Sequence, residues 1–326
     1  MPAVEERLAL ATATMVALVD DAELPPKIGV HPGPDESFAH AMPAWMRGRE
    51  GDGSRDLLGL KWVVGFPTNA TAGIPAIHGS IILSDARTGL PRAIMDAGAI
   101  TAQRTAAVSG LAIQRWGPAS ADSSAASPRA PAATTVTMVG AGVQARSHLP
   151  VVAHLLPGAD VRLCDRDPVR LELLADEVRG GMHGGDELGD VRTETDPSVA
   201  VGSADLVLTL VSFGPDRQSI PEHAFRSDAT VVAVDYDMCV PAPLARSAAM
   251  FLTDDRDQFL ANRTAATFAD YPEPNAMIGE AVVANTPRPA GRVLISHLGV
   301  GLADVVFGDA ILRAAEARDI GTILER

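Results

Sequence analysis

The chain has 326 residues, of which 47% are hydrophobic, and a formal net charge of −14 at pH 7. This length allows two domains with sizeable cores, and the negative charge argues against a nucleic acid as partner. No apolar run reaches the length of a membrane span, and the acidic N-terminal segment differs from a signal or transit peptide. We therefore expect a cytoplasmic globular protein that acts on a small molecule, with Cys164 and Cys239 as buried thiols.

The first third of the chain predicts an antiparallel sheet with helices. A helix is expected at residues 4–22, strands are expected at 61–65, 78–84 and around 93–95, and a hairpin turn is expected at 85–89. Residues 25–32 are too rich in proline for a helix. Thr101 is expected to cap a helix that runs to Trp116.

A segment rich in serine, alanine and proline, residues 117–135, then predicts a flexible connection. Beyond it strands and helices alternate, which is typical of a parallel sheet. The predicted strands are 136–139, 160–164, 191–195, 204–212, 229–236, 250–253 and 292–296, and the predicted helices include 167–178, capped by Asp167, and 302–318. A flexible glycine-rich loop is expected at 180–189. Strands 204–212 and 229–236 are nearly continuous apolar runs, as expected for parallel strands buried on both faces.

A nucleotide-binding pattern of strand, turn, helix and strand starts just before Gly140. Gly140 permits a tight turn, and Gly142 lets the backbone approach a pyrophosphate that the N–H groups of the next helix would hold. Asp165 ends the second strand, where it would accept hydrogen bonds from both adenosine ribose hydroxyls. This favours NAD over NADP, although the neighbouring Arg166 is able to bind a 2′-phosphate. Pro150 should kink or interrupt the helix.

Further cofactor-binding candidates lie close to the predicted phosphate site. Val143 and Gln144 begin the helix after the glycine turn, and Ser212 ends an apolar strand. Thr105 would donate a hydrogen bond to a phosphate near the start of an earlier helix. No spacing of histidine and cysteine suggests zinc, and neither a GxSxG nor a P-loop motif occurs. We therefore expect no metal.

The catalytic candidates are a lysine, an arginine and an aspartate. Lys27 and Lys61 are the only lysines in the chain, and Lys61 lies in an apolar strand. It is either a strand-edge lysine that faces water or a group that binds a carboxylate or donates a proton. The small neighbours of Arg104 favour an anion site over a structural salt bridge. Asp235 and Asp237 end a predicted parallel strand, and position alone leaves open which of them is the acid or base.

The histidines are harder to place. His31, His78 and His297 show no spacing that assigns them to a site. A hydrogen-bonded structural histidine is our interpretation for each of them.

Several segments resemble the ornithine cyclodeaminase/mu-crystallin family. They are residues 61–110, which include MDAGAITAQRTAA, together with VGAGVQARSHL, DRDP and SHLGVGLADVVFGDA. The resemblance implies an α/β protein with a Rossmann-type doubly wound parallel sheet for NAD(P) at residues 136–302. It also implies an α+β substrate-binding and dimerisation domain at 1–117, completed by the C-terminal helix at 303–326, with 118–135 as the connection. A homodimer is therefore expected.

The resemblance also assigns roles to single residues. Lys61 is similar to the catalytic lysine of the family, Arg104 to its substrate-carboxylate arginine, and Asp237 to its catalytic aspartate. Lys27 stands where cyclodeaminases carry a second carboxylate-binding arginine. The chain departs from the family in three ways. Lys27 replaces an arginine, and Asp235 replaces a glycine and adds negative charge to the pocket. The N-terminus also starts later than in the family.

These departures favour one activity among three. We expect an NAD-dependent amino-acid dehydrogenase or imine reductase that acts on a small amino or imino acid. The alternative is an ornithine cyclodeaminase that uses tightly bound NAD. A non-catalytic NAD(P)-binding protein of the crystallin type is disfavoured, because Lys61, Arg104 and Asp237 are all present.

Overall fold

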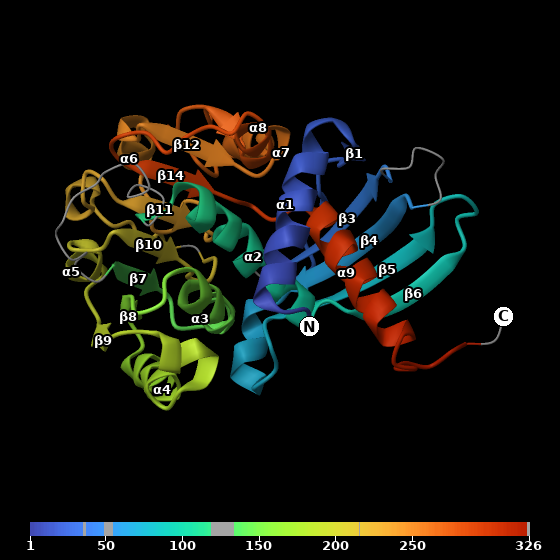
Figure 1. Ribbon diagram of the computed structural model, residues 1–326, viewed down its shortest axis with the longest axis horizontal. Helices are drawn as coiled ribbons and strands as arrows, with labels where there is room; N and C mark the ends of the chain where they lie inside the picture. Colours follow the sequence, from blue (N-terminus) through green and yellow to red (C-terminus); the bar gives the residue numbers. More distant parts are fainter. Residues whose placement is uncertain (35–36, 49–54, 119–133, 215, 325–326) are drawn as a thin grey trace. The chain divides into compact units, whose positions relative to one another are not determined.

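The computed structural model describes residues 1–34, 37–48, 55–118, 134–214 and 216–324 (Figure 1). The chain divides into two compact units, of which the first contains Met1–Arg104 and Gly299–Arg326 and the second contains Thr105–Leu298. The division falls inside a helix, between Arg104 and Thr105. Residues 119–133 of the predicted Ser/Ala/Pro-rich connection lie outside the described residues.

The first unit is built on a six-stranded antiparallel sheet with the order β1-β3-β4-β5-β6, in which β2 also pairs with β3. Its strands are β1 (Ala22–Glu23), β2 (Ile28–Val30), β3 (Phe38–Met46), β4 (Leu57–Gly65), β5 (Ile77–Asp85) and β6 (Pro91–Asp96). Its helices are α1 (Val4–Asp20), the 3-10 helix η1 (Pro67–Ala72) and α9 (Gly301–Glu316), and α2 (Gly98–Trp116) begins in this unit.

Strand β3 has no counterpart among the predicted strands, because Pro43 lies near its middle. On one side Pro43 pairs with Leu60 of β4. On the other side β2 pairs with residues 39–41 and β1 with residues 45–46, so Pro43 faces the gap between these two short strands. A proline is tolerated in a strand where no neighbouring strand needs its missing N–H.

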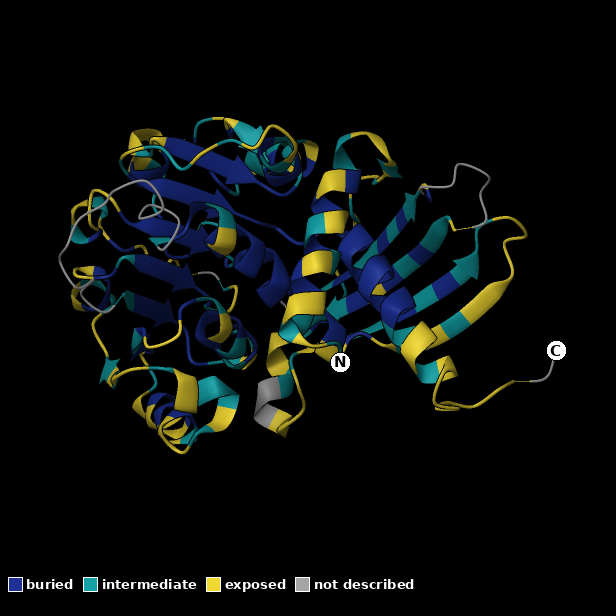
Figure 2. Cartoon of the chain, in the orientation of Figure 1, coloured by how far each residue is buried: buried dark blue, intermediate teal, exposed yellow. Residues whose placement is uncertain are grey.

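Helix α9 covers one face of this sheet, and its N-terminal turns are buried (Figure 2). The packing is close at two glycines. A Cβ on Gly59 of β4 would lie 2.8 Å from a methyl group of Val305, and a Cβ on Gly301 would lie 2.6 Å from the carbonyl oxygen of Met42. Because alternate strand residues point to opposite faces, the residue on either side of Gly59 points away from α9.

The second unit is built on an eight-stranded parallel sheet with the order β13-β12-β14-β11-β10-β7-β8-β9. Its strands are β7 (Thr135–Val139), β8 (Asp160–Cys164), β9 (Val191–Glu194), β10 (Leu206–Thr209), β11 (Thr230–Ala233), β12 (Met250–Thr253), β13 (Ala276–Met277) and β14 (Val293–Ser296). Besides most of α2, its helices are α3 (Val143–Leu155), α4 (Pro168–Arg179), η3 (Met182–Glu187), α5 (Pro197–Val201), η4 (Glu222–Ala224), α6 (Ala242–Ser247), α7 (Arg256–Thr264) and α8 (Ile278–Val283).

The strand order of this sheet reverses between β7 and β10. From β7 the chain continues to β8 and β9 on one side, and it then crosses to β10 and β11 on the other. In open parallel sheets, ligands bind at such a switch point, outside the carboxyl ends of the strands. The predicted fold class is therefore confirmed: a doubly wound parallel sheet accompanies an α+β unit that the C-terminal helix completes.

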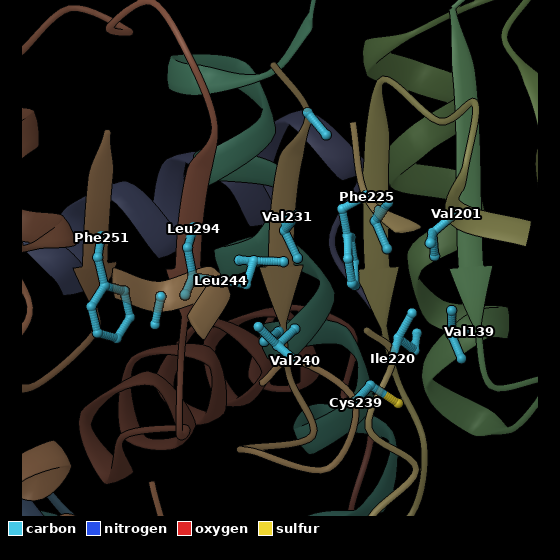
Figure 3. Close-up of a cluster of buried hydrophobic side chains, with 14 of the residues drawn as sticks. Val139, Val201, Ile220, Phe225, Val231, Cys239, Val240, Leu244, Phe251 and Leu294 are labelled. Atoms are coloured by element: carbon cyan, nitrogen blue, oxygen red, sulfur yellow. The ribbon is translucent and has the colours of Figure 1, made fainter. Parts of the chain in front are cut away.

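The apolar core of the second unit lies against its parallel sheet. Val139, Val231, Leu294 and Phe251 come from four different strands and belong to one cluster (Figure 3). All residues of β10 and β11 are buried, as predicted for parallel strands that are covered on both faces. Within the described residues no helix combines the length and the apolarity of a membrane span.

Two local predictions are wrong. Helix α2 begins at Gly98 and contains Thr101, because the Oδ1 of Asp96 accepts a hydrogen bond from the Gly98 N–H at 2.8 Å. The interruption predicted at Pro150 does not occur, and α3 is one helix from Val143 to Leu155, since buried side chains on both sides of the proline pack into the unit. The loop predicted at 180–189 includes the short segment η3, in which His183 and Gly184 have non-helical backbone angles.

Candidate functional site

The glycine turn after β7 has the geometry that the sequence predicts. Gly140 has a φ of +111°, and a Cβ there would lie 2.7 Å from the carbonyl oxygen of Leu210, so only glycine fits. Gly142 caps α3, and a Cβ at this position would meet no atom within 4 Å. The backbone is thus open to a ligand above Gly142, as close approach of a pyrophosphate requires.

The first turn of α3 offers hydrogen-bond donors to such a ligand. The first backbone N–H groups of a helix, here those around Val143 and Gln144, have no acceptor within the helix. They also lie at the positive end of the helix dipole. Val143 is 69% exposed, so the turn is accessible. These properties make this helix start suitable for an anion such as a phosphate.

Asp165 follows β8 and is tied to the glycine turn. Its Oδ2 accepts a hydrogen bond from the N–H of Ala141 at 2.8 Å, and its Oδ1 accepts one from the N–H of Asp167 at 2.9 Å. The side chain is 9% exposed. Each oxygen keeps a second lone pair, which a ribose hydroxyl can use. The Arg170 guanidinium lies 3.8 Å from Asp165, and Arg166 is exposed.

Thr105 and Ser212 have different surroundings. Thr105 lies on α2 and is only 4% exposed. Ser212 is exposed and follows β10, whose neighbour β7 leads into the glycine turn. The N–H of Leu210 donates to the carbonyl of Val139 at 2.7 Å, which holds the chain before Ser212 beside that turn.

Asp235 lies inside the second unit. Its Oδ1 accepts a hydrogen bond from the hydroxyl of Thr209 at 2.7 Å, and the residue is 1% exposed. Burial raises the pKa of Asp235 to about 6, although the hydrogen bond from Thr209 opposes this shift. Asp235 was expected to add negative charge to the pocket, and its burial against β10 leaves its own carboxylate inaccessible to a ligand.

Asp237 has more accessible surroundings. Its Oδ1 lies 3.1 Å from the Nη2 of Arg217, and its Oδ2 accepts a hydrogen bond from the N–H of Phe268 at 3.1 Å. The Arg217 side chain is 44% exposed, so this partner can be displaced. The sequence reasoning missed Arg217, which lies in an irregular segment without any motif.

Tyr236, between the two aspartates, is held in an uncommon backbone conformation. Its φ of +59° lies in the left-handed region, which a bulky side chain seldom adopts. Its ring stacks on Phe268 at a centroid distance of 5.6 Å and meets the edge of Phe213 at 4.8 Å. Strain of this kind often marks functional sites, where the surrounding structure maintains it. The outlier therefore supports a functional role for the turn after β11.

The first unit contains a buried charged cluster, which we call the Lys61 cluster and which consists of Lys61, Arg104 and Asp304. The Nζ of Lys61 lies 2.7 Å from the Oδ2 of Asp304, and the Nε of Arg104 lies 3.1 Å from its Oδ1. Asp304 is 0% exposed and Lys61 2% exposed. The chain accommodates Arg104 through Gly299, where a Cβ would lie 2.7 Å from the guanidinium. Two cations thus share one anion, which suits the cluster to a further anionic group.

Asp304 is the member of this cluster that sequence reasoning missed. A detectable signal exists, because Asp304 interrupts the apolar run between Leu302 and Val306. An acidic residue on a buried helix face requires a partner. The sequence does not indicate which basic residue provides it.

Charged groups of the first unit lie close enough to shift the pKa values of their neighbours. Burial lowers the pKa of Lys61 to about 7, and the charges of Arg104 and Lys27 lower it further, while Asp304 opposes the shift. Burial would raise the pKa of Asp304, but Arg104 and Lys61 lower it. Lys27 is half-buried and precedes β2. Burial, followed by the charge of Lys27, lowers the pKa of His40 to about 4. The region around Lys61 therefore carries an excess of positive charge.

The predicted site residues thus fall into two sets. Lys27, Lys61 and Arg104 belong to the first unit, whereas Asp237 and all the cofactor candidates belong to the second. Among the described residues, no group of three or more histidine, cysteine, aspartate or glutamate side chains is arranged to hold a metal ion.

Known proteins resemble the whole chain. It is 28% identical to the nodulation efficiency protein NfeD of Rhizobium meliloti over 312 residues, which cover 93% of this chain and 87% of that protein. The Thermococcus litoralis Δ1-pyrroline-2-carboxylate reductase, solved with NADH and L-proline, superposes with a TM-score of 0.83 at 20% identity, covering 99% of this chain and 96% of that one. An archaeal alanine dehydrogenase dimer with bound NAD superposes with a TM-score of 0.78 at 18% identity, covering 99% and 95%.

These two solved structures have the same fold as this chain, at identities too low to transfer an activity. The family model that describes the ornithine cyclodeaminase/mu-crystallin family matches residues 1–221. This match covers more than half of the chain and includes the glycine turn, Lys61 and Arg104. The chain therefore belongs to the ornithine cyclodeaminase/mu-crystallin family.

Proposed function

We propose that this protein is an NAD-dependent oxidoreductase that interconverts a small amino acid and its imino or keto acid by hydride transfer at Cα. The observation that carries the proposal is the Lys61 cluster. Lys61 and Arg104 share one carboxylate, that of Asp304, and all three side chains are buried in the first unit. A second carboxylate, from the substrate, would complete the charge balance through charge-assisted hydrogen bonds. Lys27, whose charge acts on Lys61, is a further candidate for this contact.

The residues of the second unit fit a nicotinamide dinucleotide. The open space above Gly142 and the N–H groups of Val143 and Gln144 would hold the pyrophosphate. Asp165 would accept hydrogen bonds from the ribose hydroxyls and repel a 2′-phosphate, which favours NAD over NADP. Thr105, Arg166 and Ser212 are further candidate contacts. When bound, the nicotinamide ring would accept or donate the hydride. The solved relatives that contain NADH or NAD support this assignment.

Asp237 would act at the substrate nitrogen. Its carboxylate is partly exposed and has a displaceable partner, Arg217. An incoming ammonium group would compete with the guanidinium for the same oxygen. Asp237 would then hold the ammonium and exchange a proton as the amine becomes the imine. The Phe268 N–H would keep the other oxygen in place.

One experiment distinguishes this function from two alternatives, a cyclodeaminase and a non-catalytic NAD(P)-binding protein. Purified protein with NADH should oxidise it, seen as loss of NADH absorbance, on addition of a cyclic imino acid, or of a keto acid with ammonia. Consumption of ornithine with release of ammonia and no net NADH change would instead identify a cyclodeaminase. Asp235→Gly restores the small residue of the family, and a gain of ornithine cyclisation in this variant would favour that alternative. A protein that binds NADH but converts none of these compounds would support the crystallin-type role.

We also propose a homodimer that forms through the open face of the antiparallel sheet. Pro43, Leu60, Ile82 and Ile94 pair in one row across β3, β4, β5 and β6, and all four are apolar. Leu60 neighbours Gly59, which faces α9, so this row points away from the helix. Ile94 is 69% exposed, which is unusual for an apolar residue in a sheet row. The archaeal alanine dehydrogenase of the same fold is a dimer, which supports a dimer here without indicating which face forms it.

Sedimentation tests the dimer directly. The wild-type protein should sediment as a dimer, or a multiple of it, at micromolar concentration. Introducing charge in the row with Leu60→Glu and Ile94→Glu should produce monomers, because two carboxylates would be buried at the contact. Leu173→Glu, a change at a 58% exposed apolar residue of α4, is the matched control and should leave the assembly unchanged. A wild-type monomer would contradict the proposal.

A further inference from the structure

Three buried polar side chains form a hydrogen-bonded chain inside the second unit. The Oγ of Ser109 lies 2.8 Å from the Nε2 of His148 and 2.8 Å from the Nε2 of His297. None of the three residues is more than 2% exposed. Ser109 belongs to α2, His148 belongs to α3, and His297 directly follows β14, so the chain joins three elements.

The partners determine the direction of each hydrogen bond. The Nδ1 of His148 lies 2.7 Å from the carbonyl oxygen of Gln144, which can only accept. His148 therefore carries a proton on Nδ1. Burial lowers the pKa of His148 to about 3, so the ring is neutral at pH 7 and its Nε2 is an acceptor. Ser109 donates its single proton to this nitrogen, and its oxygen accepts the Nε2–H of His297.

These hydrogen bonds fix the positions of the three side chains and do not provide a path for proton transfer. The series of donors runs from His297 through Ser109 to His148 and ends on the Gln144 carbonyl. An amide carbonyl does not accept a proton at neutral pH, so a relay would have no exit. Each buried group is hydrogen-bonded, which offsets the cost of removing it from water. Every member is thus held in one orientation, with each hydrogen bond running in one direction.

The central bond lies one helical turn from two cofactor candidates. Ser109 is four residues after Thr105 on α2, and His148 is four residues after Gln144 on α3. Residues four apart lie on the same face of a helix, about 6 Å from each other along its axis. The Ser109–His148 bond therefore fixes the spacing between the turn that carries Thr105 and the turn that carries Gln144.

We propose that Ser109, His148 and His297 are positioning residues that hold α2 and α3 at the spacing required to bind the dinucleotide. The proposal rests on the proposed function, since it takes the glycine turn and α3 as the pyrophosphate site. None of the three side chains is assigned a contact with the cofactor. They act through Thr105 and through the Gln144 carbonyl, which His148 holds at the start of α3.

Two substitutions of His148 separate the link between the helices from the link to Gln144. In His148→Gln, the longer side chain places an amide near the former Nε2, so the bond to Ser109 is kept. In His148→Asn, the shorter side chain reaches the Gln144 carbonyl but not Ser109. We expect His148→Asn and Ser109→Ala to raise the Kd for NADH about tenfold, the effect of losing one buried hydrogen bond. His148→Gln should raise it less than about twofold.

A matched control separates positioning from stability. Thr230 is buried and donates its hydroxyl to the Trp116 carbonyl at 2.7 Å, in the same unit and outside the chain of Ser109 and the two histidines. Thr230→Val should lower the Tm and leave the Kd for NADH unchanged. The inference is overturned if Ser109→Ala binds NADH as tightly as wild type, or if Thr230→Val weakens binding equally. A wild-type protein that binds neither NADH nor NADPH would contradict the proposed function, and this inference with it.

A second readout does not depend on the cofactor. Nitrogen NMR of protein labelled at histidine reports which ring nitrogen carries the proton. We expect His148 to be protonated on Nδ1 and His297 on Nε2 at neutral pH. Protonation of His148 on Nε2 would overturn the assigned direction, and with it the anchoring of Gln144.

Discussion

The two sheets of this protein position their candidate functional residues in different ways. In the first unit, Lys61 comes from the middle of a strand and points from the face of an antiparallel sheet toward α9. In the second unit, Gly140, Asp165 and Asp237 all follow parallel strands, where the chain leaves the sheet. A group on a covered face is surrounded by apolar side chains, whereas a group at an edge lies among loops. This difference decides how strongly function and stability are coupled in each unit.

Two ion pairs, one in each unit, illustrate this coupling of function and stability. Lys61 and Asp304 are almost completely buried, so neither charge has water as an alternative partner. Breaking such a pair from one side typically costs about 3–5 kcal/mol. Arg217 and Asp237 are 44% and 13% exposed, and a pair of this kind contributes about 0–1 kcal/mol. We therefore expect removal of a charge at the face to lower stability strongly, and changes at the edge to affect catalysis or binding with little loss of stability.

The largest effect is expected at the edge. Asp237→Asn removes the acid and base while keeping the shape of the side chain, and we expect turnover to fall about 10²–10⁴-fold. NADH binding, measured by fluorescence titration, should stay nearly unchanged, because Asp237 holds no part of the glycine turn. Asp235→Asn is the control, since Asp235 is bonded to Thr209 inside the unit. Wild-type turnover in Asp237→Asn would show that the assignment is wrong and make Asp235 the next candidate.

Changes in the Lys61 cluster should lower the stability of the protein. Asp304→Asn leaves two buried cations without their counter-ion, and we expect the free energy of unfolding in urea to fall by about 3–5 kcal/mol. Removing Lys61 as well, in Lys61→Met with Asp304→Asn, should recover part of this loss, because one of the two uncompensated charges is then gone and only that of Arg104 is left. Arg217→Gln breaks the exposed pair and should cost less than about 1 kcal/mol. Equal losses in Asp304→Asn and Arg217→Gln would refute the contrast between face and edge.

The pH dependence of substrate binding follows from Lys61. A lysine is charged below its pKa, and the pKa of Lys61 is lowered to about 7, first by burial. As pH rises above this value, Lys61 loses its charge and binds a carboxylate less well. We therefore expect kcat/KM to fall about tenfold per pH unit above the pKa of the free enzyme. Lys61→Arg stays charged and should remove this dependence, and a wild-type profile that stays flat to pH 9 would argue against the role of Lys61.

The smallest effect concerns cofactor choice. Asp165→Ser removes the carboxylate that would repel a 2′-phosphate, while Arg166 and Arg170 remain close by. The preference for NADH over NADPH, as the ratio of the two Kd values, should therefore narrow or invert. Titration of the wild type with both reduced cofactors provides the reference. Tighter binding of NADPH by the wild-type protein would contradict the assignment of NAD.

The local elements could be predicted well from the sequence. The predicted strands at 160–164 and 250–253 have the bounds of β8 and β12, and Asp167 caps α4 by accepting hydrogen bonds from two backbone N–H groups. Apolar runs, glycine turns and helix caps are patterns among neighbouring residues, so a short segment contains the information. The glycine turn at Gly140 and the family membership were recognisable for the same reason.

Long-range partners could not be predicted in this way. Arg104 and Asp304 lie 200 residues apart in the chain, and only the packing of α9 on the sheet places them 3.1 Å from each other. The same holds for strand β3, which tolerates Pro43 because of the gap left by its two short partners. His297 was interpreted as structural, and only the fold reveals that it shares Ser109 with His148.

The sequence by itself determined the two kinds of sheet, the nucleotide-binding turn and the identity of the charged residues. Only the tertiary structure decided which charges are paired, which are buried and which remain accessible. Asp235 and Asp237 illustrate the division, since they are two positions apart and alike in sequence terms. One is enclosed beside Thr209 and the other faces Arg217, because the chain turns at Tyr236. Burial and pairing depend on what the rest of the chain places around a residue, and no local pattern contains that information.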